Sequence, residues 1–307
     1  MSRVSVIIPS RHERFLRPTV DDVLRHATGD IEVIVIDDGC ALPVLPVDPR
    51  LRVMHTETPR GMRAGINAAA QLATGQFLLK LDAHCSLSEG FDEVLQADCD
   101  VDWVVIPRRD RLDPIAWCRQ ETGKPPIDHH YLNWPLHKPD DPNCGLHGSI
   151  WPARSTTRQD ILIDDEMTTQ GSCWFMPREY FLRRMWPLDQ EHYGNITHEA
   201  QEITLKCWLS GGRVVVNKHA TYLHLHKGKT YGRGYPLGSG EHARSTAYCA
   251  DYWMHDRWPA AIYPLSWLIE KFWPVPTWPS NITRAFAHYR EVMAGAVWPS
   301  QNDSLEP

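Results

Sequence analysis

The segment QFLLKLDAHC, residues 76–85, joins an apolar run to side chains that can carry chemistry. Residues 76–81 are typical of a buried strand, and Asp82-Ala83-His84 follow at the point where that strand ends. In an extended segment positions i and i+2 point the same way, so Asp82 and His84 could face one divalent ion. Carboxylate with imidazole suits Mn²⁺ or a similar metal, which would neutralise a diphosphate. The alternative is a capping Asp beside an unrelated surface His.

Upstream of this segment, strand and helix patterns alternate. Val4–Pro9 and Ile31–Ile36 are short β-branched runs, and Pro18–His26 between them has helical character, as does the Ala-rich Arg63–Ala73. Such alternation predicts an α/β fold with a mostly parallel central sheet and ligands at the carboxyl ends of its strands. Asp37-Asp38-Gly39 lies at such an end, where acidic residues commonly hold a nucleoside. A turn capped by Asp is the alternative interpretation.

Downstream, the pattern is broken by a long excursion. Val101–Ile106 is a further expected strand. The segment Pro107–Pro152 that follows is rich in Pro, His and Arg and shows little periodicity, and long segments of this kind within a compact domain are usually functional or mobile. Regular apolar periodicity begins again at Glu199–Leu209, an expected helix that ends before Gly211-Gly212. A strand is expected next, at Arg213–Val216. The remaining segments are a glycine-rich loop at Tyr231–Glu241, a helix at Ala243–Asp256 and an aromatic, proline-rich tail at Trp258–Pro279.

Composition excludes several classes of protein. The chain has 32 Lys and Arg against 38 Asp and Glu, a net charge of −6 that argues against coating nucleic acid by non-specific phosphate contacts. No Gly-x-Gly-x-x-Gly fingerprint follows the first strand and no Walker loop appears, so dinucleotide redox chemistry and ATP hydrolysis are not expected. With no signal-peptide pattern, no apolar run of the roughly 18 residues that span a membrane, and eight scattered Cys, we expect a cytoplasmic protein without a spanning segment.

Several motifs together resemble one enzyme class. Val4–Pro9, Ile34–Gly39, Arg60–Asn67 and Leu81–Cys85 are similar to the nucleotide-sugar-binding half of the GT-A glycosyltransferases. The Asp-x-His version of the metal motif resembles the polypeptide N-acetylgalactosaminyltransferases, and so does the order of three later segments, Asp165–Gly171, His198–Ile203 and His219–Lys227. This resemblance implies a GT-A domain over residues 1–257, divided into a nucleotide-sugar and metal half (1–100) and an acceptor half (101–257). Residues 258–307 form a Trp- and Pro-rich C-terminal extension, expected on the acceptor side.

The resemblance also implies site residues. The metal, most often Mn²⁺ with Mg²⁺ possible, would be held by Asp82, His84 and His224, with His226 as the less favoured third ligand. Two histidines and one carboxylate leave open positions for two phosphate oxygens. Glu199 and Glu202 would be catalytic. The nucleotide sugar, expected to be UDP-linked, would contact Pro9, Arg11, Glu13, Asp37, Asp38, Arg60, Arg63, Asp82, Lys227 and Arg233.

Two local features refine these expectations. Residues 211–245 carry six Lys and Arg against one Glu, so Lys227, Lys229 and Arg233 could screen phosphates, although a solvated basic face is the alternative. Ala200 stands where the large inverting bacterial family places its Asp base, directly after the Glu. A missing base predicts a retaining reaction, in which the departing phosphate takes the acceptor proton. An inverted product would instead make Glu199 or Glu202 the base.

The acceptor is the least determined feature. The run Leu81–Cys85 also resembles viral and protist enzymes that glycosylate hydroxymethylated pyrimidines in DNA, as in bacteriophage DNA hypermodification, and this acceptor is our first expectation. An enzyme that acts on such a base must flip it out of the DNA helix, so it needs aromatic rings that stack on the base and basic residues along the DNA backbone. The candidates are Arg108, Arg109, Arg111, Trp117, Trp134, Trp151 and the tail Trp253–Trp278, unless the tryptophans pack the core. The alternatives are a cytoplasmic transferase acting on protein Ser/Thr or on a polysaccharide or lipid-linked glycan, and a nucleotide-sugar-binding module without catalysis.

Overall fold

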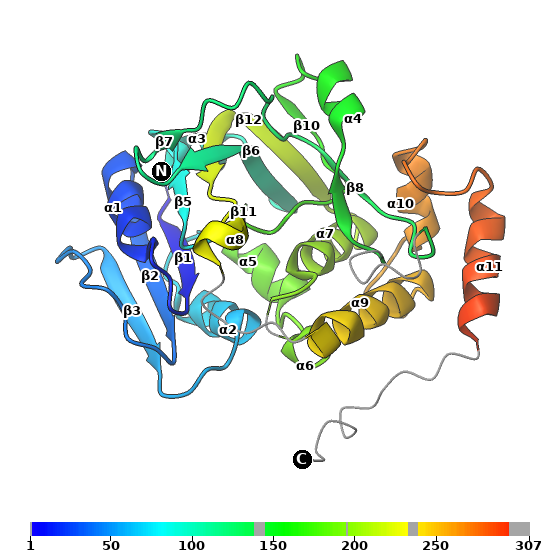
Figure 1. Ribbon diagram of the computed structural model, residues 1–307, viewed down its shortest axis with the longest axis horizontal. Helices are drawn as coiled ribbons and strands as arrows, with labels where there is room; N and C mark the ends of the chain where they lie inside the picture. The colour runs from blue at the N-terminus through cyan, green and yellow to red at the C-terminus, as the bar shows by residue number, and fades with distance from the viewer. Residues whose placement is uncertain (1, 138–144, 195, 233–238, 295–307) are drawn as a thin grey trace.

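The computed structural model describes residues 2–137, 145–194, 196–232 and 239–294. A large mixed sheet passes through this part of the chain, in the order β10-β12-β6-β11-β4-β1-β2-β3, with β5 paired to β12 and β7 to β6 (Figure 1). Its strands are β1 (Val4–Ser10), β2 (Ile31–Asp38), β3 (Leu51–Thr56), β4 (Phe77–Leu81), β5 (Cys85–Leu87), β6 (Trp103–Asp113), β7 (Cys118–Arg119), β10 (Ile163–Asp165), β11 (Cys173–Pro177) and β12 (Arg213–His224). A separate ribbon pairs β8 (His130–Leu132) with β9 (Gly148–Ile150).

The longest pairings in the sheet are parallel, as the alternating pattern predicts. β1 pairs in parallel with β2 and β4, β2 with β3, and β6 with β12, while β11 runs antiparallel between β4 and β6. The pairing sets Ser10 opposite Asp37, so β1 and β2 end at the same edge. The α/β fold with a mostly parallel sheet is therefore confirmed.

Helices cover both faces of the sheet because its buried strands are apolar on both sides. Along β1, Val4, Val6 and Ile8 belong to the buried cluster that contains Leu16, Val20 and Phe91, whereas Ile7 belongs to the cluster that contains Ile66 and Ile203. The helices are α1 (Leu16–His26), α2 (Met62–Leu72), α3 (Phe91–Ala97), α4 (Pro152–Thr157), α5 (Arg178–Tyr180), the π-helix η1 (Phe181–Met185), α6 (Gln190–Tyr193), α7 (Glu199–Leu209), α8 (Gly228–Tyr231), α9 (Ser239–Met254), α10 (Leu265–Lys271) and α11 (Ile282–Met293).

Two strands are longer than the sequence pattern predicts. β6 continues to Asp113, so the excursion after residue 106 begins as strand, and β12 continues from Val216 to His224. Polar residues and a register shift between Asn217 and Thr221 interrupt the alternation of apolar residues in β12. The second half of the strand therefore cannot be recognised from the sequence pattern. The continuation matters because it carries His224 to the same edge as β4 and β5.

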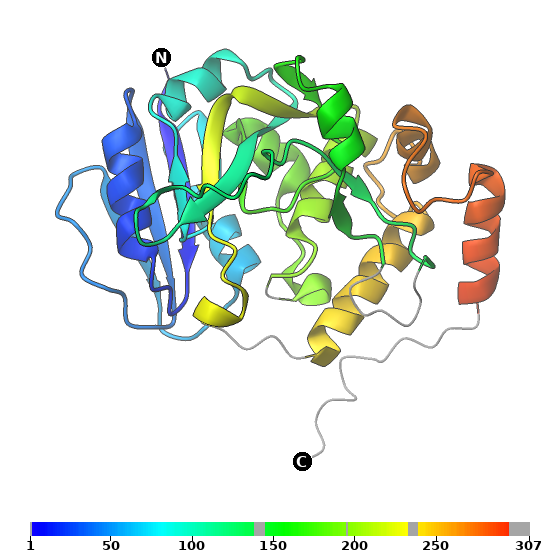
Figure 2. The same ribbon diagram turned by 45° about the horizontal axis from the view of Figure 1, so that its top comes forward.

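The C-terminal extension is aromatic, as predicted, and it packs into the main core. Trp278 donates from Nε1 to the carbonyl oxygen of Leu132 at 2.8 Å and belongs to the cluster that contains Trp134 and Trp253. Figures 1 and 2 place α10 and α11 beyond α9, on the opposite side of the molecule from β1–β3. Within the described ranges, no helix combines the length and apolar character needed to cross a bilayer.

Candidate active site

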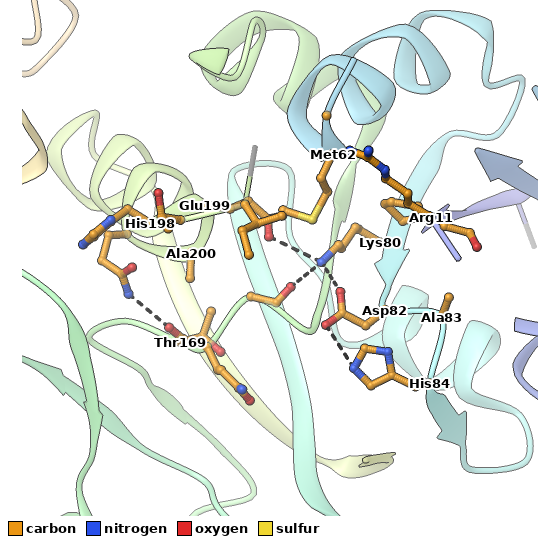
Figure 3. A pocket seen from close by; sticks show the side chains of 18 of the residues that line it. Arg11, Met62, Lys80, Asp82, Ala83, His84, Thr169, His198, Glu199 and Ala200 are labelled. Carbon is orange, nitrogen blue, oxygen red and sulfur yellow. Dashed lines mark hydrogen bonds and ion pairs between the residues drawn. The ribbon is translucent and has the colours of Figure 1, made fainter. Parts of the chain in front are cut away.

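A pocket of about 370 Å³ opens beside the carboxyl ends of β1 and β4. Two walls form it. We call its lining residues from positions 9–84, together with Lys227, the Asp82 wall, and its lining residues 147–201, together with His242, the His198 wall. Figure 3 shows Asp82, His84 and Arg11 on one side, His198, Ala200 and Thr169 on the other, and Lys80 between them.

Asp82 and His84 of the Asp82 wall come together with His224, which is not itself among the residues that line the pocket. Asp82 and His84 follow β4, and His224 ends β12, where it pairs with Cys85. The Nε2 atoms of the two histidines lie 3.2 Å apart, and Asp82 Oδ2 lies 3.9 Å from that of His84 and 3.7 Å from that of His224. One ligand atom from each residue falls within 4.8 Å of the others. This donor set of two imidazoles and a carboxylate fits a divalent transition metal.

The electrostatics of the cluster favour the metal-binding protonation states. Burial, aided by the nearby His84, lowers the pKa of His224 to about 3, so its imidazole is neutral at neutral pH. Burial alone would raise the pKa of Asp82, but Lys80 and the two histidines hold it well below its ordinary value. A neutral imidazole and an ionised carboxylate are the forms that coordinate metals.

Glu13 and Lys227 stand behind His84. Glu13 Oε2 lies 3.3 Å from His84 Nδ1 and accepts a 2.7 Å hydrogen bond from Lys227 Nζ. Although burial opposes it, His84 and Lys227 keep the pKa of Glu13 below its ordinary value. A carboxylate on the far nitrogen of a ligating histidine orients the ring and raises its basicity. Glu13 is thus placed to support a metal ligand.

Lys80 connects the two walls, and the sequence analysis missed it. Its buried Nζ donates to Asp82 Oδ1 at 2.6 Å and to the carbonyl oxygen of Gly171 at 2.7 Å, and lies 3.4 Å from Glu199 Oε2 (Figure 3). Burial lowers the pKa of Lys80, but Asp82 and Glu199 outweigh it and raise the pKa. The available signal was a lysine inside an apolar strand, two residues before Asp82.

Glu199 lies at the base of the pocket with both oxygens engaged. Its Oε1 accepts a 2.7 Å hydrogen bond from Trp174 Nε1, and its Oε2 faces Lys80. The side chain is almost fully buried as the first residue of α7. Glu199 is therefore a fixed negative charge in the pocket rather than a free carboxylate.

Two other predicted site residues, Arg63 and Glu202, are buried outside the pocket lining. Arg63 is fully buried; its Nε donates to Glu202 Oε2 at 3.1 Å, and its guanidinium also donates to the carbonyl oxygens of Gly194 and Thr197. Glu202 Oε1 in turn accepts from Lys206 Nζ at 2.7 Å. Neither residue lines the pocket. They hold the backbone of the His198 wall.

The remaining predicted nucleotide contacts divide between the pocket and its surroundings. Pro9, Arg11, Asp38 and Lys227 line it, and Arg11 Nε is buried without a partner among the described residues. Asp38 accepts from the backbone nitrogens of the turn 60–61, and Asp37 lies 2.6 Å from His55 Nδ1; neither Asp37 nor Arg60 lines the pocket. His226 is exposed and lies outside the three-residue cluster. Arg233 falls outside the described residues.

The arginines and tryptophans expected to hold a displaced base do not line this pocket. Trp134 and Trp151 are buried in the core, and Trp117 donates from Nε1 to Asp22. Arg108 pairs with Asp128, and Arg109 lies against His130. Packing is therefore the role of these tryptophans. Besides His84, the residues with aromatic rings that line the pocket are His147, His198 and His242, which the sequence analysis did not select as site residues.

Comparisons with known proteins agree with this architecture. The model of the family described as "Glycosyl transferase family 2" matches residues 5–183. A putative polypeptide N-acetylgalactosaminyltransferase 13 from Drosophila melanogaster is 26% identical over 249 residues, covering 70% of this chain and 40% of that protein. Polypeptide N-acetylgalactosaminyltransferase 11 from Xenopus tropicalis is 26% identical over 275 residues, covering 82% and 43%. The chain thus spans about two fifths of the length of these relatives.

A solved structure shows the same fold. The crystal structure of GalNAc-T7 with UDP, GalNAc and Mn²⁺ superposes with a TM-score of 0.65 at 18% sequence identity. The superposition covers 95% of this chain and 55% of that one. It therefore extends over both walls of the pocket and the C-terminal helices.

Proposed function

This chain belongs to glycosyl transferase family 2, and from that premise we propose that it transfers a sugar from a UDP-linked donor to a hydroxyl group, with a divalent ion at Asp82, His84 and His224. The predicted resemblance to GT-A glycosyltransferases is confirmed by the family match and the shared fold. The observation that carries the proposal is the cluster of these three side chains, two of which, Asp82 and His84, line the pocket. Mn²⁺ is the ion we propose, because the donor set combines imidazoles with a carboxylate.

The residues around the cluster suit the departure of a diphosphate. A bound divalent ion would act there as a Lewis acid for the leaving phosphate oxygens. Arg11 and Lys227 add positive charge on the same wall, and Glu13 orients His84. Lys80 keeps Asp82 ionised and fixes Glu199 beneath the pocket, where its negative charge would stabilise positive charge that develops on the sugar.

We propose that the anomeric configuration is retained. Glu199 is engaged by Trp174 and Lys80, Glu202 is behind the wall, and residue 200 is alanine. The departing phosphate would then take the acceptor proton on the same face of the sugar. NMR of the product linkage tests this. An inverted linkage would overturn it and make Glu199 the base.

For the acceptor we propose a hydroxymethylated pyrimidine in DNA. The run Leu81–Cys85 supports this choice, and so do the three imidazole rings of the His198 wall, since histidine rings can stack on bases. They replace the tryptophans that the sequence analysis expected. A protein Ser or Thr is the second candidate, favoured by the relatives named polypeptide N-acetylgalactosaminyltransferases. A cytoplasmic location remains a prediction.

One assay separates these functions. The protein is incubated with Mn²⁺ and UDP-glucose, UDP-N-acetylglucosamine or UDP-N-acetylgalactosamine, and with either hydroxymethylated oligonucleotides or Ser/Thr peptides. We expect the DNA to gain the mass of one sugar, and Asp82→Asn to abolish the gain. Transfer to peptide alone would replace DNA by protein as the acceptor. Binding of UDP-sugar without turnover or metal dependence would favour a binding module over a transferase.

A further inference from the structure

Lys80 is a buried ammonium group whose hydrogen bonds are all made within the protein. Its side chain is 1% exposed, and Nζ donates to Asp82 Oδ1 at 2.6 Å, to the carbonyl oxygen of Gly171 at 2.7 Å and to Glu199 Oε2 at 3.4 Å (Figure 3). An ammonium group has three protons to donate. Each proton of Lys80 therefore has an acceptor in the protein, and Nζ needs no ligand to hold it in place.

The sheet and Glu199 fix this lysine on the side away from Asp82. In β4, Lys80 pairs with Ile7 of β1 and with Trp174 of β11. Trp174 donates from Nε1 to Glu199 Oε1 at 2.7 Å, so two neighbours across the sheet hold the two oxygens of Glu199. Glu199 in turn holds Nζ beside Asp82.

The two carboxylate oxygens of Asp82 have different surroundings. Oδ1 accepts the hydrogen bond from Lys80, whereas Oδ2 faces the histidines, 3.7 Å from His224 Nε2 and 3.9 Å from His84 Nε2. Oδ2 is thus the ligand atom that Asp82 offers to an ion shared with the two histidines. Such an ion meets one carboxylate oxygen and two imidazole nitrogens.

The number of oxygen ligands affects which divalent ion such a site holds. Ca²⁺ takes about six to eight oxygen ligands, and a carboxylate often supplies two of them by binding bidentately. Two imidazoles and a single carboxylate oxygen instead favour a transition-metal ion. An aspartate at position 82 with both oxygens free would offer the bidentate mode that Ca²⁺ uses.

We propose that Lys80 is a positioning residue that limits Asp82 to one ligating oxygen, Oδ2, and thereby makes the site select Mn²⁺ over Ca²⁺. Lys80 engages Oδ1, so the carboxylate does not chelate the ion with both oxygens. Its other bonds, to Gly171 and Glu199, do not involve the metal ligands, so the restriction exists before an ion binds. This inference rests on the proposed metal-dependent transfer and goes beyond it, because it names the residue that decides which ion is bound.

Direct binding of the ions tests the proposal without turnover. Electron paramagnetic resonance measures free Mn²⁺ while the protein is titrated, first alone and then in competition with Ca²⁺. In the wild-type protein Ca²⁺ should bind at least about 100-fold more weakly than Mn²⁺. In Lys80→Met, whose folding is checked by circular dichroism, this ratio should fall by about 10-fold or more, because the change frees Oδ1. Equal binding of the two ions to the wild type, or an unaltered ratio in folded Lys80→Met, would overturn the proposal.

Lys206→Met is the matched control for the loss of a buried lysine. Lys206 is 9% exposed, and its Nζ donates to Glu202 Oε1 at 2.7 Å and to the carbonyl oxygen of Met185 at 3.0 Å, outside the pocket lining. This variant also breaks an internal ion pair, but it should leave the ratio of Mn²⁺ to Ca²⁺ binding unaltered. An equal fall in Lys206→Met would show that reduced stability changes the ratio, and would overturn the role of Lys80.

A crystal structure of the wild-type protein with Mn²⁺ tests the same point without a variant. Asp82 should ligate through Oδ2 alone, with Oδ1 still bonded to Lys80, and ligation by both oxygens would overturn the proposal. Failure of the proposed function gives different results. Mn²⁺ that binds the wild type no more tightly than Asp82→Asn would overturn both proposals, whereas the expected binding ratios without sugar transfer would support the role of Lys80 and overturn only the transferase.

Discussion

The two walls of the pocket differ in charge and in origin. The Asp82 wall carries ionised groups, with Asp82 against Lys80 and Glu13 against Lys227. The His198 wall, apart from Glu199, is lined by uncharged residue types and histidines: threonines, glutamines, glycines, an isoleucine and an alanine beside the imidazoles. A charged wall suits the diphosphate of the donor, whereas a neutral wall can read hydrogen-bond donors and acceptors on a second substrate. Under the proposed function, the Asp82 wall supplies the chemistry and the His198 wall faces the acceptor, while Lys80 connects the two walls.

The largest effect on activity is expected on the Asp82 wall. Asp82→Asn removes the anionic ligand and should reduce both transfer and acceptor-free UDP release by more than about 100-fold, beyond the range for residues that only support a ligand. Chelation of metal from the wild-type protein should do the same, and added Mn²⁺ should restore the rate. Assays of UDP release measure both. Turnover that survives chelation would contradict the metal centre.

The connection between the walls is the next target. Lys80→Met leaves Asp82 and Glu199 without their shared cation in a buried position, which should cost about 3–5 kcal/mol of unfolding free energy. Urea denaturation measures the cost. Glu199→Gln in the Lys80→Met background removes one of the two charges and should recover part of it. An unchanged urea midpoint in Lys80→Met would show that the ion pairs of Lys80 with Asp82 and Glu199 do not contribute to the stability of the fold.

Arg63 supports the His198 wall although it lies on α2, in the N-terminal half of the chain. Arg63→Met breaks a fully buried ion pair with Glu202 and frees two carbonyl oxygens, so we expect a loss of about 3 kcal/mol in stability. In the protein that remains folded, KM for the acceptor should rise more than KM for the UDP-sugar. The opposite order would restore the sequence-based assignment of Arg63 to the donor.

The smallest effect is expected behind the metal ligands. Glu13→Gln keeps the shape of the side chain but removes the charge beside His84, which should weaken Mn²⁺ affinity by about 10- to 100-fold. Titration of acceptor-free UDP release with Mn²⁺ gives the affinity, and saturating Mn²⁺ should recover most of the rate. Arg52→Gln, which removes a surface partner of Glu32, is the matched control and should leave the affinity unaltered.

The sequence predicted more of the residues on the Asp82 wall than on the His198 wall, and the difference has a physical cause. Asp82 and His84 are two residues apart after a strand, so a local motif was enough to select both, although Ala83 and His84 form a turn rather than extended chain. His224 joins them only through the pairing of β12 with β5, and the resemblance to a known family supplied it. Local pattern also predicted the α/β fold and α7, because both follow from the period of apolar residues.

The His198 wall depends on contacts between distant segments, which no local pattern encodes. His147, His198 and His242 come from separate parts of the chain and meet only after folding. Arg63 illustrates the same limit from the other direction. Its place in a motif resembling donor-binding residues suggested contact with the ligand, but the sequence does not reveal that its side chain is fully buried. The tryptophans were ambiguous for the same reason, because their number does not reveal whether the rings face a pocket or the core.

The attachment of Trp278 to Leu132 has a consequence for the order in which the molecule is made. The two residues are 146 positions apart, and Trp134 and Thr277 form a second bond across almost the same separation. During synthesis β1, β2 and β4 emerge early and can pair with one another, whereas Leu132 and Trp134 wait for almost the whole chain before Trp278 and Thr277 exist. Contacts of such long range slow folding, so β1, β2 and β4 should pair first on the ribosome, and the cluster of Asp82, His84 and His224 should form only after β12 is made.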